Sequence, residues 1–181
     1  RVSGPVSCDL HALQQLQMAL RKGKWTVTIA LRAGCQIVAV WPGLKHQILG
    51  AAVDVGSTTM SAHICDMNDG TVLASTGIMN PQIRFGEDLM SRVSYGIMNE
   101  GGAAEMTKVV CEGLQQLIAG GAEQAGFTTD DVLEVVLVGN PVMHHLLLGI
   151  DPVELGGAPF ALAVDTATEI KADEINLSLN R

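Results

Sequence analysis

The chain has 181 residues, enough for one domain or for a domain with a small second unit, and it carries a formal net charge of −8. This acidity, with no basic stripe and only 3% aromatic residues, excludes a surface for nucleic-acid phosphates or stacked bases. The hydrophobic content of 48%, before the 20 glycines are counted, indicates either a sheet covered on both faces or surface that packs against something outside the chain.

The lengths of the apolar runs and the spacing of the cysteines both favour a cytoplasmic protein. No apolar run approaches the roughly 18 residues of a membrane span, so we expect no membrane segment. The four cysteines lie far apart, and no pair has the spacing of a metal site or a redox motif. We therefore expect reduced thiols in a cytoplasmic protein.

Residues 1–49 are expected to form a small separate α+β unit, a linker or middle domain. Leucines at helical spacing predict a helix that stops at Gly23: Leu10, Leu13, Leu16 and Leu20. Two β-rich runs follow, Trp25–Leu31 and Cys35–Trp41, joined by a glycine-containing connection of hairpin length.

From residue 50 the pattern predicts an antiparallel meander of three strands. The first runs from about Leu49 to Val55, turns at Gly56–Thr58 and returns as Met60–Asp66. The letters MNDG form the next tight turn before a third strand, Thr71–Gly77. We therefore expect these three strands to form the antiparallel part of a mixed sheet.

Two helices and a further strand come next. We expect helices at Glu87–Met98 and Ala103–Ala125, then a strand at Val132–Gly139. The second helix has an apolar face: Met106, Val109, Val110, Leu114, Leu117 and Ile118. A strand, a helical crossover and another strand imply right-handed addition of a parallel strand to the sheet. Asn140 as cap and Pro141 at the first helical position open another helix.

The turn after the first meander strand is a candidate phosphate site. Successive backbone N–H groups at such a tip can bind phosphate oxygens, and a glycine permits close approach. The Asp54 carboxylate stands where it could orient a hydrated magnesium ion, with no direct metal ligation. The alternative is an ordinary hairpin whose small residues fit the turn, and the turn by itself does not decide between them. The residues concerned are Asp54, Gly56, Ser57, Thr58 and Thr59.

The predicted strand order resembles the first subdomain of the actin-like ATPase and sugar-kinase superfamily, with its ribonuclease H-like α/β fold. Three segments, AAVDVGSTTM, NPQIRFGEDLMSRV and VLVGNPVMHHLLLGIDP, carry the resemblance further. Together they resemble the nucleotide-binding domain of the ferredoxin-linked reductive activators of corrinoid proteins, over roughly Trp25 to Phe160. Three motifs in this order are far more specific than any one of them.

That resemblance implies a modular parent protein with an N-terminal [2Fe-2S] ferredoxin domain, a linker and middle domain, and an ATPase domain. It implies that ATP with magnesium drives electron transfer to a corrinoid methyl-transfer protein, restoring Co(I) from Co(II). Residues 50–181 would be the first subdomain of an incomplete ATPase domain. We expect this piece alone to be inactive and to bind nucleotide weakly, since the nucleotide lies between two subdomains in that superfamily.

The resemblance also assigns residues. It makes the 54–59 stretch the first phosphate loop, to which Gly139 and Asn140 of a strand-to-helix corner are added. The signature loop comprises Asn80, Pro81, Gln82, Arg84 and Gly86, with Met143 and His145 from the corner. Pro141 stands where the family more often has a hydroxyl residue.

Four charged or titratable residues have simpler interpretations. Arg84 could be a solvated charge at a helix start. For Arg92 we favour an i,i+4 pair with Asp88 on an exposed helix face. The adjacent His144 and His145 point about 100° apart on a helix and cannot easily share a metal, so at least one is expected to pack or cap.

Three functions stay open from the sequence. The first is the ATP-dependent corrinoid activator. The second is a small-molecule kinase of the same superfamily, with Asp54 on magnesium and the catalytic base elsewhere. The third is a non-enzymatic partner-binding or dimerisation module, in which the Leu10–Leu20 helix and the two following strands supply the surface; a homodimer is one form of it.

Overall fold

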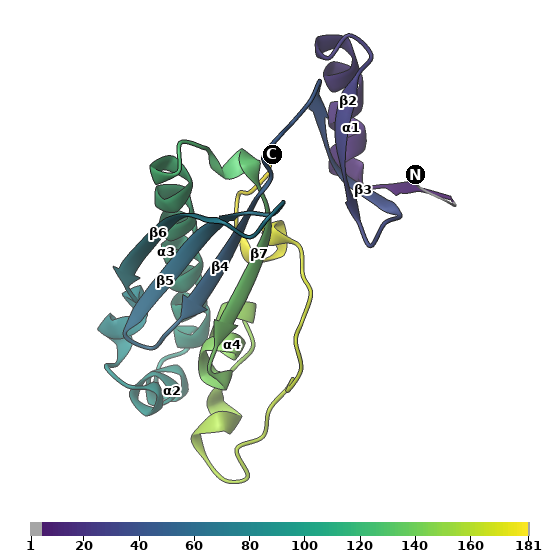
Figure 1. Cartoon of the computed structure of the whole chain (residues 1–181). Helices are drawn as coiled ribbons and strands as arrows, with labels where there is room; N and C mark the ends of the chain where they lie inside the picture. Colours follow the sequence, from purple (N-terminus) through teal and green to yellow (C-terminus); the bar gives the residue numbers. More distant parts are fainter. Residues whose placement is uncertain (1–4, 181) are drawn as a thin grey trace. The chain divides into compact units, whose positions relative to one another are not determined.

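The computed structural model describes residues 5–180. The chain divides into two compact units, one reaching Ile48 and including Asn180, the other running from Leu49 to Leu179 (Figure 1). We call them unit 1 and unit 2. Among the described residues, no helix is both long and apolar enough to cross a bilayer.

Unit 1 is one helix on a small mixed sheet. The helix α1 (Leu10–Lys22) packs on β3, and its buried alanines, Ala12 and Ala19, form a core with Val40. The sheet order is β1-β3-β2, with β1 (Ser7–Cys8) parallel and β2 (Val27–Arg32) antiparallel to β3 (Gln36–Pro42). The predicted helix and hairpin are therefore present.

Two details of unit 1 differ from the sequence pattern. The predicted strand at Trp25 starts later, at Val27, because Lys24 and Trp25 have φ values of 51° and 66° and turn the chain after α1. Two of the leucines that predict the helix point away from the core: Leu10 and Leu13 are 68% and 50% exposed, whereas Leu16 packs against the core.

Unit 2 contains the predicted mixed sheet, in the order β6-β5-β4-β7. The strands β4 (Leu49–Val55), β5 (Thr59–Asp66) and β6 (Val72–Met79) form the antiparallel meander. The strand β7 (Val132–Gly139) pairs in parallel with β4, with Val55 opposite Gly139. The mixed α/β fold class predicted from the sequence is confirmed.

The connections place helices on one face of this sheet (Figure 1). They are α2 (Leu89–Met98), α3 (Gly102–Gln124) and α4 (Pro141–Leu148), with short 3-10 turns η1 (Pro81–Phe85), η2 (Thr129–Asp131), η3 (Val153–Gly156) and η4 (Ala172–Ile175). The long helix α3 packs on β5 and β6. It approaches so closely that a Cβ on Gly121 would lie 2.8 Å from Cγ1 of Ile64. The predicted apolar face of α3 is buried: Met106, Val109, Val110, Leu114, Leu117 and Ile118.

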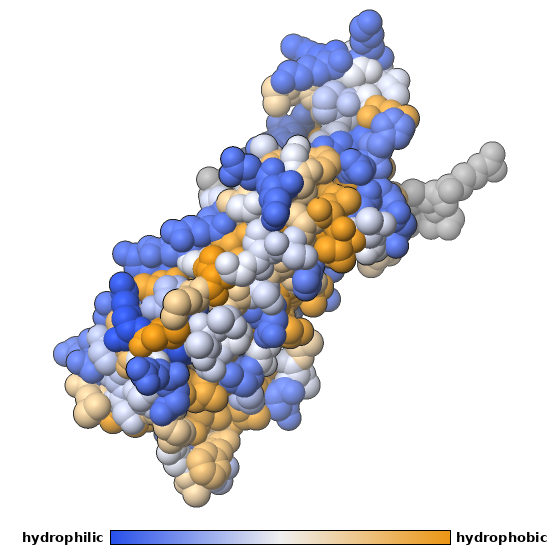
Figure 2. All heavy atoms as spheres, turned by 60° about the vertical axis from the view of Figure 1, so that its left-hand side comes forward, coloured by the Kyte–Doolittle hydropathy of each residue, from blue (hydrophilic) through white to orange (hydrophobic). Residues whose placement is uncertain are grey.

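The opposite face of the unit 2 sheet is open within the described residues. Along β4 the residues alternate, so that Ala51, Val53 and Val55 are buried while Asp54 is exposed. On the same open face of β7, Val136 and Val138 are 56% and 58% exposed. The high apolar content thus does not come from a sheet covered on both faces, and Figure 2 shows apolar side chains at the protein surface among polar ones.

Candidate functional site

The turn between β4 and β5 lies at the end of the central strand of unit 2. Gly56 is required there by space, because a Cβ at this position would lie 2.5 Å from the Thr59 carbonyl oxygen. Asp54 projects from the open face of β4, beside Ser61 of β5 and Val138 of β7 in the sheet register. Thr58 and Thr59 are exposed at the tip.

Three successive carbonyls of this turn accept hydrogen bonds from the interior of unit 2. Asn80 Nδ2 donates to the Gly56 oxygen at 2.8 Å, and the Asn80 backbone N–H donates to the Thr58 oxygen at 2.8 Å. Between them, Arg92 Nη2 donates to the Ser57 oxygen. The turn is therefore held from behind at each of its residues.

These bonds fix where the amide N–H groups of the turn point. A trans peptide is planar, and its C=O and N–H point in opposite directions. With the Gly56 and Ser57 oxygens held inward, the N–H groups of Ser57 and Thr58 point away from Asn80 and Arg92. Neither N–H donates to an acceptor among residues 5–180. Free, successive N–H groups at a turn are a binding arrangement for anions such as phosphate.

The predicted signature loop is anchored in the interior by its amides. Asn80 and Gln82 are 1% and 0% exposed. Asn80 Oδ1 accepts the Gln82 N–H at 2.9 Å and so caps η1. Gln82 Nε2 donates to the Met106 carbonyl on α3 at 3.0 Å, and Pro81 lies against Gly113 of the same helix.

Arg92 does not lie where the sequence suggested. The expected exposed pair with Asp88 is wrong: the Arg92 side chain is 0% exposed, and Asp88 instead caps α2 by accepting the Ser91 N–H at 2.7 Å. The helical spacing explains the difference. Leu89, Arg92 and Val93 share the inward face of α2, so the apolar neighbours at i−3 and i+1 were the available signal.

The Arg92 guanidinium is bonded on several sides. Nε donates to the Gly86 carbonyl at 3.0 Å. Nη1 lies 3.5 Å from Gln82 Oε1 and 3.4 Å from Met143 Sδ. We call Asn80, Gln82, Arg92 and Met143 the Arg92 cluster. It connects the turn, the signature loop and the strand-to-helix corner.

The electrostatics of the cluster are unusual because Arg92 meets only neutral acceptors. Burial lowers the pKa of Arg92, and the Asp88 carboxylate raises it by a smaller amount. An arginine stays protonated through such shifts. Among the described residues, no ion pair includes Arg92. A positive charge therefore lies buried directly behind the turn.

The corner between β7 and α4 supplies the third side of the cluster. A Cβ on Gly139 would lie 3.1 Å from the Val55 oxygen, so glycine allows β7 to end tightly against β4. Asn140 Oδ1 accepts the Met143 N–H at 3.0 Å and caps α4, with Pro141 in the first turn. This cap places the Met143 sulfur against Arg92 and within 3.7 Å of Asn80 Nδ2.

His145 and Arg84 lie outside the cluster. Both ring nitrogens of the buried His145 are bonded: Nδ1 donates to the Pro141 oxygen at 2.8 Å, and Nε2 accepts the Ala163 N–H at 3.1 Å. The expectation that one of the adjacent histidines packs or caps is thus confirmed. Arg84 is exposed, 3.8 Å from a Glu105 oxygen and stacked over Phe85.

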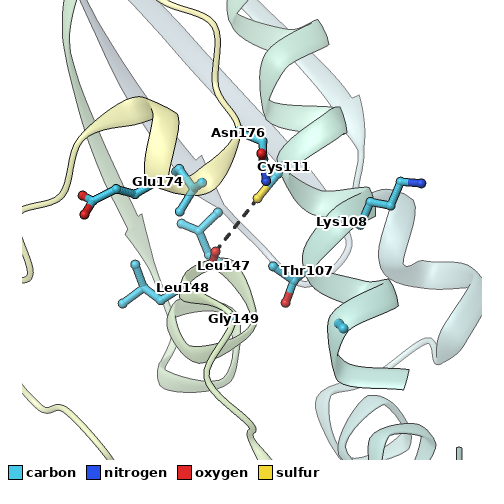
Figure 3. Close-up of a pocket in the computed structure, with 10 residues that line it drawn as sticks. Thr107, Lys108, Cys111, Leu147, Leu148, Gly149, Glu174 and Asn176 are labelled. Atoms are coloured by element: carbon cyan, nitrogen blue, oxygen red, sulfur yellow. Dashed lines mark hydrogen bonds between the residues drawn. The ribbon is translucent and has the colours of Figure 1, made fainter. Parts of the chain in front are cut away.

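Two cavities of unit 2 lie away from these residues. The smaller, of about 240 Å³, lies between α3, the end of α4 and the 174–176 segment. Figure 3 shows Lys108 and Glu174 pointing away from it, and Cys111 Sγ donating to the Leu147 carbonyl at 3.9 Å. Burial raises the pKa of Cys111, which keeps the thiol neutral and unreactive. The larger, of about 550 Å³, lies at the start of α3. Neither is lined by a predicted site residue.

Comparisons with known proteins agree with the two units. Residues 49–181 match the family described as the RACo middle region, and residues 1–47 match the RACo linker region. The corrinoid activation enzyme RamQ of Eubacterium limosum is 31% identical over 150 residues, which cover 82% of this chain and 25% of that enzyme. A solved structure titled a reductive activator for corrinoid, iron-sulfur protein aligns with a TM-score of 0.82 and 29% identity, covering 98% of this chain and 29% of that one. The chain thus spans about a quarter of the length of these relatives.

Proposed function

The chain belongs to the RACo middle region family, and from that premise we propose that it is part of an ATP-dependent reductive activator of a corrinoid protein. The activator restores Co(I) in a corrinoid methyl-transfer protein with electrons from a [2Fe-2S] ferredoxin domain outside these residues. Residues 1–49 serve as the linker, and residues 50–181, which lie in the part that matches the middle region, as the first subdomain of an actin-like ATPase domain. The names of the relatives support corrinoid activation.

One observation carries the nucleotide part of this proposal. The carbonyls of Gly56, Ser57 and Thr58 are all held inward, which leaves the N–H groups of Ser57 and Thr58 free to bind phosphate oxygens. An ordinary hairpin needs no buried arginine and asparagine behind its turn. The pattern favours the phosphate cradle over the simple hairpin that the sequence left open.

Different residues of the site bind the phosphate and the magnesium of MgATP. The turn binds phosphate oxygens, and the exposed Asp54 carboxylate orients magnesium through its bound water, which is how this ion is usually held. MgATP, when bound and hydrolysed, supplies free energy that biases domain closure. The cradle lies on an open surface of unit 2 and not in either cavity. A turn on an open surface contacts a phosphate from one side only, so we expect these residues alone to bind nucleotide weakly.

The test replaces Asp54 by asparagine in the complete protein, purified without oxygen. We expect Asp54→Asn to abolish ATP-supported reduction of Co(II) to Co(I), followed by the visible absorption of the corrinoid. The matched control is Asp69→Asn, which removes an exposed carboxylate in the β5–β6 turn and should leave the rate unchanged. Full activity of Asp54→Asn would contradict the assigned role.

The kinase alternative is separated by the absorption spectrum of the complete protein. A [2Fe-2S] centre gives charge-transfer bands in the visible region under anaerobic conditions. A colourless protein that hydrolyses ATP would instead favour a small-molecule kinase.

A second role, for unit 1, is partner binding, and it is favoured by the exposed side chains of Leu10 and Leu13 on α1. A second copy of the protein is the simplest partner. Leu10→Glu with Leu13→Glu should convert a dimer of the complete protein to a monomer in light scattering, while Leu16→Ala, a half-buried position, tests for loss of folding. A dimer that persists in the Glu variant would exclude α1 as the interface.

A further inference from the structure

Arg92 joins three segments that are far apart in the chain. Its guanidinium bonds the Ser57 carbonyl of the phosphate turn, the Gly86 carbonyl of the signature loop and the Met143 sulfur of α4. These partners lie 35, 6 and 51 residues from Arg92 in the sequence. One rigid side chain thus sets the relative positions of the segments that border the turn.

The bond to Ser57 has a specific geometric consequence. The Ser57 carbonyl and the Thr58 N–H belong to one planar peptide, so holding the oxygen inward aims the N–H outward. Asn80 Nδ2 does the same for the preceding peptide through the Gly56 oxygen. Arginine suits this task because its planar fork makes several fixed hydrogen bonds at once, which a lysine ammonium cannot.

The charge of Arg92 has a second consequence. Buried charges in proteins are ordinarily paired or bound to ligands, since an unpaired one is costly. Here the described partners are carbonyl oxygens, an amide oxygen and a thioether, all neutral. Within residues 5–180 the Asp88 carboxylate forms no ion pair with Arg92, and it raises the Arg92 pKa by less than burial lowers it. An anion held by the Thr58 N–H would be a second counter-charge, separated from the guanidinium by a single peptide group.

We propose that Arg92 is the positioning residue of the phosphate site, which aims the Thr58 N–H and supplies the positive charge that selects phosphorylated ligands. This role rests on the proposed function, because it assigns a determinant of phosphate affinity at the same turn. Arg92 does not touch the ligand; it acts through the Ser57–Thr58 peptide.

The experiment measures binding of MgATP and of adenosine to the complete protein by calorimetry. Arg92→Lys keeps the charge and loses the fork, and Arg92→Gln loses both. We expect the affinity for MgATP to fall on the order of tenfold in Arg92→Lys and further in Arg92→Gln. Adenosine has no phosphate, so its affinity should stay within about twofold. The matched control is Lys108→Gln, an exposed cation on α3 that is paired with Glu112.

A structural role would give a different result. If Arg92 only supported folding, its replacement would weaken MgATP and adenosine binding equally, and that outcome overturns the proposal. So does MgATP binding at the affinity of the unchanged protein. If the unchanged protein itself does not prefer MgATP to adenosine, the proposed function fails before Arg92 is tested.

A second variant keeps the proposal testable should both Arg92 variants unfold. Gln82→Glu places a carboxylate beside Arg92 Nη1 and loses the bond from Gln82 Nε2 to the Met106 carbonyl, but it leaves the bond from Arg92 to Ser57 in place. The internal carboxylate neutralises the charge that would otherwise attract phosphate, so MgATP affinity should fall on the order of tenfold with the turn intact. Unchanged preference for MgATP over adenosine in Gln82→Glu would overturn the electrostatic part of the proposal.

Discussion

The Arg92 cluster and the segment held by His145 both use one buried polar side chain to join distant parts of unit 2. His145 is satisfied by two neutral backbone groups, the Pro141 oxygen and the Ala163 N–H. Arg92 makes four hydrogen bonds but carries a charge that none of its described acceptors neutralises. The difference shows that several hydrogen bonds do not by themselves make a buried group structural. A buried cation with neutral partners still attracts an anion.

The largest difference between the two regions is expected from a substitution that distorts the turn held by Arg92. Gly56→Ala puts a Cβ within 2.5 Å of the Thr59 oxygen, so the backbone must shift. We expect a loss of about 3 kcal/mol in the free energy of unfolding and loss of MgATP binding. Urea titration measures the first and calorimetry the second. Gly77→Ala is the control, because its Cβ would lie 3.7 Å from the Met60 oxygen, an ordinary contact. Equal effects of the two variants would contradict the special position of Gly56.

The next largest loss of stability is expected from replacing His145. His145→Ala leaves the Ala163 N–H without its acceptor and removes a buried ring, which should cost about 2 kcal/mol. The local consequence is sharper than the global one: amide exchange should speed up at Ala163 and not at Asn80, whose buried N–H donates to the Thr58 carbonyl. His144→Ala, a half-buried neighbour on the same helix, is the matched control and should change neither. Faster exchange at both Ala163 and Asn80 would mean that the two regions are not independent.

Much of this arrangement follows from local sequence patterns. Alternation along residues 49–66 predicted β4 and β5, and the helical spacing of Met106 to Ile118 predicted the buried face of α3. The caps Asn80 and Asn140 are local too, since each accepts a backbone N–H within three residues. These features depend only on neighbours in the chain, so the sequence contains them directly.

The parts that sequence reasoning missed depend on distant partners. A charged residue is assigned to solvent by default, and Arg92 could be buried only because carbonyls from Ser57 and Gly86 and the sulfur of Met143 come to it. Likewise nothing near His145 in the sequence points to Ala163 as its partner. The inward face that Arg92 shares with Leu89 and Val93 was a usable signal, but it was outweighed by the i,i+4 spacing to Asp88.

Replacing Arg84 should destabilise the protein less than the changes above, although Arg84 and Arg92 lie in the same segment, NPQIRFGEDLMSRV. Arg84→Gln removes an exposed pair with Glu105 at 3.8 Å, which should cost less than about 1 kcal/mol because solvent screens it. Its effect should match that of Lys108→Gln, which breaks an exposed pair of the same kind at 3.9 Å. Thermal unfolding compares them. A loss in Arg84→Gln as large as in Gly56→Ala would show that Arg84 belongs with the buried cluster after all.

The smallest effect concerns Asp88, which the sequence paired with Arg92 and the structure places at the start of α2. The pKa of Asp88 lies below its ordinary 3.8, first because it accepts the Ser91 backbone N–H and then because of the Ser91 side chain. In the unfolded chain the carboxyl binds its proton at a higher pH than in the folded one. The contribution of Asp88 is therefore present above pH 3.8 and is lost as the pH falls through the lowered pKa.

Asp88→Asn isolates this contribution, because asparagine also caps helices well but does not titrate. At pH 7 the variant and the unchanged protein should unfold at nearly the same temperature. As the pH falls below 3.8, the unchanged protein should lose more stability than Asp88→Asn, and calorimetric scans at successively lower pH measure the difference. An ion pair with Arg92 would instead make Asp88→Asn costly at pH 7, since it would leave the buried cation without its partner. The pH 7 measurement therefore decides between a cap and an ion pair, and with it whether Arg92 keeps its charge for a ligand.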